Sequence, residues 1–498
     1  NSGTLTLGAN LVFGATTVAD GATLRLGAFT AQFGTLTVGS GGAGATFACT
    51  ASASCTGTKT FAGTITVNTN STFDLSNGSV APSPTFSSTS ISHSGSKFNT
   101  GTGTHTISGT GALAITGSSS MTFGGTVTIP TNRALTNSNT STVTIAALTF
   151  ASPTAANSLT LNNGSTTNIT GALTFTANAT ANTQTLTIGN GASGAANITV
   201  GSIVMNAPTS TGASTITCFA SATQTGTLTV SGSGTISITG NSTSTGLASI
   251  DMSPGGCNVV SGTGASAITL TGGSNATGGF ATLKMGTGTL TMNGDLVFGG
   301  ANAGKSLLNM SANGGTIVLN GATLPAVGTS GAYTITASTN LTSTGTSNFN
   351  YATAVTTWGT ITVNNGTLTM SSAAQTATAV TVANSATLAM GSRLLTTTGN
   401  LSCGSGGSAT ISGSTGITVS GASSVSAATT AYALAGIPNL NVGIVTATSF
   451  NGPLTGNVTG NLTGNVTGNL TGNITGTSGY AATAGISSAV SGTININT

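Results

Sequence analysis

The cysteines are the residues whose spacing most directly suggests chemistry. Cys49 and Cys55 enclose a loop that is short enough for a local disulfide. Cys218 and Cys257 lie further apart and would join different turns of the chain, and Cys403 is left over. Because no cysteine has the spacing of a metal site, the sequence favours two disulfides over buried thiols, and metal binding is the weakest alternative.

Residues for acid–base catalysis are scarce. The chain has no Glu, and its four Asp and two His are widely separated. Enzymes that cleave polysaccharides use paired carboxylates, and only Asp251 and Asp295 would form such a pair, if adjacent turns of the chain bring them together. A single Asp between strands more often stabilises a turn. We therefore expect no enzyme activity, no metal site and no cofactor.

The low charge excludes several kinds of partner. Seven Lys/Arg and four Asp/Glu make up 2% of 498 residues, against roughly 25% in an ordinary soluble domain. A net charge of +3 cannot form the basic surface that holds a nucleic-acid backbone. No apolar stretch is long enough to span a membrane as a helix. With so few titratable groups, we also expect stability to change little between about pH 3 and 10.

One short pattern recurs along most of the chain. A Gly is followed by alternating Thr and aliphatic residues, as in 3–7, 34–38, 63–67, 226–230 and 359–363. This period of two predicts short strands with Leu, Ile or Val on one face and Thr on the other. Asn-Gly pairs such as 163–164 and 365–366 predict left-handed turns between strands. The chain is therefore predicted to be all-β, with no significant helix.

The length of this pattern favours an elongated β-solenoid (β-helix) over a sandwich or barrel. Short Thr/Gly-rich strands continue over residues 1–435 without linkers, which predicts one long shaft. In a solenoid each residue stacks on its equivalents in neighbouring coils. Like charges would repel there, whereas Thr, Ser and Asn form hydrogen-bonded ladders.

Residues 436–480 have a different pattern. The phrase Gly-Ile-Val-Thr-Ala-Thr-Ser-Phe begins at Gly443, and a Thr-Gly-Asn-aliphatic tetrapeptide then repeats from Thr455 to Ile474. Residues 437–480 resemble the repeat regions of phage tail-fibre proteins. The longer part before them resembles the β-strand-repeat portions of bacterial surface and fibre proteins. The first resemblance implies a trimer that recognises a host receptor, and the second implies a surface appendage.

The two ends of the sequence share one phase of alternation. Both have Ser-Gly-Thr followed by alternating residues, and 481–498 is predicted to hold a C-terminal strand. We expect these strands to pair between subunits head to tail, which gives an open filament. The residues expected at this contact are Ser2, Gly3, Thr4, Leu5, Thr6, Leu7, Gly492, Thr493, Ile494, Asn495 and Ile496.

These observations predict an extracellular structural fibre protein. It would form a filament or surface appendage by self-association, head to tail or side by side, with its own copies as main partner and surface glycans or a host receptor as adhesive partners. The first residue is Asn rather than Met, which suggests a processed product outside the cell. The alternative is a trimeric phage tail-fibre segment on the virion. A minor alternative is an ice-binding solenoid with Thr-x-Thr arrays, against which the irregular spacing of the threonines argues.

Overall fold

The computed structural model confirms an all-β solenoid. It describes residues 2–425, apart from 50–54, 77–81, 131, 153, 178, 193, 222, 276, 301, 303, 311–313, 326–330, 336–337, 351–357, 371–372, 405–407 and 422. The chain divides into two units, Asn1–Pro438 and Asn439–Thr498. All described residues belong to the first unit, so the predictions for 436–480 and 481–498 lie outside them.

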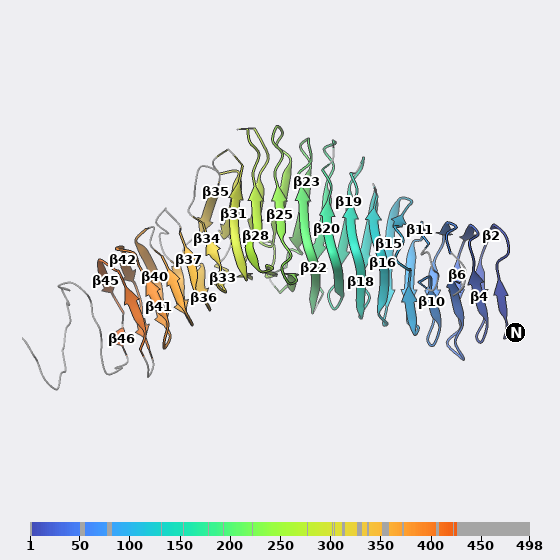
Figure 1. Cartoon of the computed structure of the whole chain (residues 1–498), viewed down its shortest axis with the longest axis horizontal. Helices are drawn as coiled ribbons and strands as arrows, with labels where there is room; N and C mark the ends of the chain where they lie inside the picture. Colours follow the sequence, from blue (N-terminus) through green and yellow to red (C-terminus); the bar gives the residue numbers. More distant parts are fainter. Residues whose placement is uncertain are drawn as a thin grey trace, which may run out of the picture. The chain divides into compact units, whose positions relative to one another are not determined.

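The described strands form three parallel sheets, which we call A, B and C. Sheet A has 28 strands, sheet B has 13 and sheet C has five. Each coil contributes a strand to a first, a second and a third row, and each strand pairs in parallel with its equivalent one coil later (Figure 1). No described residue lies in a helix, and no membrane-spanning helix is found among them.

Sheet A contains the first row and most of the second. Its first-row strands are β1 Thr4–Thr6, β4 Thr23–Leu26, β7 Thr46–Cys49, β10 Thr72–Asp74, β13 Lys97–Asn99, β24 Thr225–Val230, β27 Asn258–Val260, β30 Thr289–Met292, β33 Thr316–Leu319, β36 Asn340–Ser343, β43 Leu401–Cys403 and β46 Ser423–Val425. Its second-row strands are β2 Leu11–Phe13, β5 Ala31–Phe33, β8 Lys59–Phe61, β11 Pro84–Phe86, β14 His105–Ile107, β25 Ile236–Thr239, β28 Gly264–Thr271 and β31 Gly294–Gly299.

Some strands of sheet A are long enough to serve two rows. The strands that run through the first and second rows are β16 Met121–Ile129, β18 Thr142–Phe150, β20 Thr166–Phe175 and β22 Ala195–Asn206. Register shifts interrupt the pairing of the first three of these with their successors, which marks the bend between the two rows. Near the other end of the described chain, β38 Trp358–Val363 and β40 Gln375–Val382 continue the first row of sheet A through their pairing with β36 and β43. Sheet A also contains β42 Leu394–Thr397 and β45 Gly416–Val419.

Sheets B and C complete the coils. Sheet B is the third row, with β3 Thr16–Val18, β6 Leu36–Val38, β9 Ile65–Val67, β12 Ser90–His93, β15 Gly111–Gly117, β17 Arg133–Asn137, β19 Asn157–Leu161, β21 Gln184–Ile188, β23 Ala213–Cys218, β26 Leu247–Asp251, β29 Ala281–Lys284, β32 Ser306–Met310 and β35 Gly331–Ile335. Sheet C continues the second row, with β34 Thr323–Leu324, β37 Ser347–Phe349, β39 Thr367–Thr369, β41 Thr387–Ala389 and β44 Thr410–Ser412.

The core is a set of apolar ladders inside the coils. Phe13, Phe33 and Phe61 are paired residues of consecutive coils, and their rings stack with centroids 5.0 and 5.5 Å apart. Phe47 and Phe73 form a second stack, with centroids 5.1 Å apart. As the alternating sequence predicts, the aliphatic residues of most strands are buried and the threonines face outward.

Coil length varies without breaking the ladders. Thr4 pairs with Thr23, which is 19 residues later (23 − 4), whereas Thr166 pairs with Asn197, which is 31 residues later (197 − 166). The irregular spacing of the threonines therefore does not prevent their alignment, and that expectation was wrong. The turns absorb the extra residues, because strand pairing fixes only the residues within the rows.

Candidate functional site

The first coil presents the strongest candidate site, because its strands are paired on one edge only. β1, β2 and β3 bond to β4, β5 and β6, and their opposite edges have no partner among the described residues. Leu5, Leu11 and Val12 are 60%, 40% and 77% exposed, which is unusual for apolar residues of this chain. An open edge of this kind is a template for another strand.

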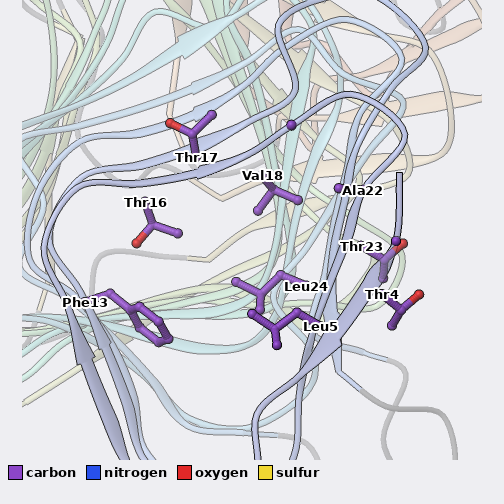
Figure 2. Close-up of a pocket in the computed structure, with 11 residues that line it drawn as sticks. Thr4, Leu5, Phe13, Thr16, Thr17, Val18, Ala22, Thr23 and Leu24 are labelled. Carbon is purple, nitrogen blue, oxygen red and sulfur yellow. The ribbon is translucent and has the colours of Figure 1, made fainter. Parts of the chain in front are cut away.

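An apolar hollow of about 410 Å³ opens beside these edges. Figure 2 shows Leu5, Phe13, Thr16, Val18 and Leu24 pointing into one space, whereas Thr4, Thr17 and Thr23 point away from it. In the second coil the inward residues Phe33, Leu36 and Val38 are fully buried, because the first coil lies on one side of them and the third coil on the other. The hollow therefore continues the interior of the stack, and one further coil placed on β1–β3 would fill it.

The sequence predictions for this edge can be placed in part. Ser2, Gly3, Thr4, Leu5 and Thr6 are exposed. Leu7 is buried, and it is bonded through its N–H to the Arg25 carbonyl. The second half of the predicted contact, Gly492–Ile496, lies outside the described residues.

The direction of the backbone bonds shows which groups of β1 are free. The Gly3 carbonyl accepts a hydrogen bond from the Thr23 N–H, and Leu7 N–H donates to the Arg25 carbonyl. Alternate residues of a strand bond to opposite neighbours, so the odd-numbered residues of β1 face β4. The N–H and C=O groups of Thr4 and Thr6 therefore face the open edge.

The cysteines lie at corners of the solenoid. Disulfides join Cys49 to Cys55 and Cys218 to Cys257, with Cα atoms 6.0 and 5.9 Å apart. The second bond connects the end of β23 to the residue before β27, so it ties sheet B to sheet A. Cys403 is buried and free, and burial raises the pKa of its thiol.

The described acidic groups have structural partners. Asp251 lies in sheet B, 3.5 Å from Lys284, whereas Asp295 lies in sheet A and accepts the Thr323 N–H at 2.6 Å. The two carboxylates therefore belong to different sheets and do not form the pair considered from the sequence. No group of metal-ligating side chains is found in the described part of the chain.

The other two Asp residues also stabilise turns or strands. Asp20 accepts hydrogen bonds from the Ser40 hydroxyl and N–H and from the Gly42 N–H, which lower the pKa of its carboxyl. Asp74 lies 2.5 Å from the Lys97 Nζ. Burial raises the pKa of Asp74, but the hydrogen bonds from Lys97 and Ser76 outweigh burial and lower it overall.

Two buried cations could not be found from the sequence. Lys59 is fully buried, no carboxylate among the described residues pairs with it, and its Nζ donates to the carbonyls of Phe29 and Gly57 at 2.7 and 2.6 Å. Burial lowers the pKa of Lys59 to about 8. Arg133, 1% exposed, donates to the carbonyls of Thr110 and Ser88. Both cations hold coil corners together through backbone carbonyls.

Comparison with known proteins gives no family to draw on. No protein-family model, curated protein or solved structure matches this chain. Any function must therefore be argued from the coil stack and its open edge.

Proposed function

We propose that this chain is the shaft of an extracellular structural fibre that assembles by stacking another copy onto β1–β3. The observation that carries this proposal is the open edge of the first coil, with its apolar hollow and exposed Leu5 and Val12. A coil from a second copy would pair the free N–H and C=O groups of Thr4 and Thr6 and bury the hollow. The two disulfides agree with an oxidising compartment.

The test compares two charged variants of neighbouring residues. Leu5→Lys places an ammonium group in the hollow, whereas Thr4→Lys places the same group on the outer face of β1. We expect the natural chain to form rods longer than one molecule in electron micrographs, Thr4→Lys to keep them and Leu5→Lys to abolish them. Monomers at every concentration, or rods that survive Leu5→Lys, would overturn the proposal.

A proline provides a second, backbone-level test. Thr6→Pro removes an N–H from the open edge and leaves the bonds to β4 intact, and Thr6→Ala is its control. We expect only the proline variant to shorten the rods. If both variants assemble equally well, strand pairing at this edge is not the contact.

The resemblance of residues 437–480 to phage tail fibres supports a second candidate. In that case the chain would be a trimeric segment of a virion fibre that recognises a receptor or glycans on the host. The mass of the native particle separates the two candidates, because a closed trimer has three copies at all concentrations, whereas an open stack grows with concentration.

A further inference from the structure

One outer face of sheet A carries a long, uncharged array of hydroxyl groups. It consists of the two outward residues of each first-row strand segment from β18 to β38, and we call it the threonine face. Its first line is Thr142, Thr166, Asn197, Thr227, Asn258, Thr289, Thr316, Asn340 and Thr360. Its second line is Thr144, Asn168, Thr199, Thr229, Val260, Thr291, Val318, Thr342 and Thr362.

The two lines are in register over nine consecutive strands. Twelve of these eighteen residues are Thr, four are Asn and two are Val, and all of them are exposed or half-buried. Strand pairing spaces them by about 4.8 Å along each line, and two residues along a strand separate the lines by about 6.7 Å. The result is a regular lattice of hydroxyl and methyl groups on a rigid backbone.

Backbone and amide bonds keep this lattice in place. The Oδ1 atoms of Asn197, Asn258 and Asn340 accept the N–H of Thr227, Thr289 and Thr360 in the next coil, at 3.1, 2.8 and 2.9 Å. Each of these three threonines follows a Gly. The asparagines therefore act as rungs between coils and hold the lines at one spacing although the coils differ in length.

The threonine hydroxyls of the face are largely free to bind water. Thr360 alone among them bonds to protein, through Oγ1 to Asn340 Oδ1 at 3.0 Å, as far as the described contacts go. By contrast, turn residues such as Thr176 donate to backbone carbonyls. The face also lacks Lys, Arg and Asp, which would hold a liquid-like hydration shell.

We propose that the threonine face binds ice. A growing ice surface is a rigid lattice of water oxygens, and it is recognised by groups that are equally rigid, evenly spaced and uncharged. The hydroxyls can replace water oxygens of the lattice, and the methyl groups order the water between them. This activity does not depend on assembly at β1–β3.

Sheet B provides a matched control surface. Thr215 of β23 is half-buried and points outward, as Thr229 of β24 does. However, the residues of sheet B that follow β23 include charged side chains. Asp251 lies one coil after β23, paired with Thr217, and Lys284 lies two coils after it. A bulky side chain at Thr215 therefore lies outside the threonine face and leaves its lattice intact.

The experiment measures thermal hysteresis and inhibition of ice recrystallisation on the purified chain. We expect both in the natural chain, a loss of at least about tenfold in Thr229→Tyr, and unchanged activity in Thr215→Tyr, with equal circular dichroism for all three. An inactive natural chain, or equal loss in the two variants, would overturn the proposal. Since the assembly assay uses Leu5→Lys and electron microscopy, failure here leaves the fibre proposal standing.

Discussion

At the scale of single residues, the few titratable groups are more consequential than their number suggests. His93 and His105 are both fully buried among phenylalanines, with His93 5.6 Å from the Phe98 ring and His105 6.3 Å from the Phe86 ring. The His93 Nε2 has no hydrogen-bond partner. Burial lowers the pKa of each imidazole to about 4. The expectation of pH-independent stability therefore has to be corrected on the acidic side.

We predict a loss of stability as the pH falls from 6.5 to 4. In this range the unfolded chain binds a proton at each His, whereas the folded chain does not. Each His therefore lowers the free energy of unfolding by about 3 kcal/mol at pH 4. Hydrogen exchange of β12–β14 at both pH values measures the change. The double variant His93→Gln, His105→Gln should flatten the slope, and a slope equal to that of the natural chain would contradict the assignment.

At the scale of elements, glycine fixes how closely the coils approach. Gly14, Gly34 and Gly63 stack at one corner, where Gly34 N–H donates to Gly14 O and Gly63 N–H donates to Gly34 O at 3.0 and 2.8 Å. A Cβ atom at Gly63 would lie 2.7 Å from the Gly34 carbonyl oxygen. The backbone of the preceding coil therefore leaves no room for a side chain at Gly63, the first residue of this copy of the repeated pattern.

We predict that Gly63→Ala destabilises these coils by about 1–3 kcal/mol, because the backbone has to shift away from the new methyl group. Gly14→Ala is the control, since nothing lies within 4 Å of a Cβ atom there. Urea titration followed by circular dichroism, or exchange of the β5 and β9 amides, measures the difference. Equal stability of the two variants would show that the corner tolerates side chains.

The disulfides act on the same scale, and loop length predicts their relative effect. Cys218 and Cys257 are 39 residues apart and Cys49 and Cys55 are six apart. By loop entropy, removing the Cys218–Cys257 bond lowers the free energy of unfolding by about 4 kcal/mol, and removing the Cys49–Cys55 bond lowers it by about 2 kcal/mol. Urea midpoints of the double variants Cys218→Ala, Cys257→Ala and Cys49→Ala, Cys55→Ala test this order. The reverse order would mean that strain or residual structure dominates.

At the scale of the whole molecule, ladders of neutral side chains replace ionic contacts. Only two ion pairs, Lys97–Asp74 and Lys284–Asp251, occur among the described residues. We predict that the urea midpoint changes little between about 0.05 and 1 M NaCl, because salt screens only exposed charges and these pairs are few. A large loss of stability in salt would reveal an electrostatic contribution that the described contacts do not contain.

The sequence by itself determined the strands and their buried faces. Period-two alternation acts within a few residues, so Leu36 and Leu228 could be assigned to the core from their neighbours. The expected left-handed turns at Gly164 and Gly366 were also confirmed, with φ of 83° and 65°.

Only the tertiary structure decided which strand lies beside which. The same pentapeptide pattern forms β1 and β24 in the first row and the β6 and β9 region in the third row. A copy of the pattern therefore does not show to which row its strand belongs. The physical reason is that alternation is local, whereas register depends on pairing between residues 19 (23 − 4) to 34 (247 − 213) positions apart, across turns of variable length. The burial of Lys59 and the alignment of the threonine face follow from that register.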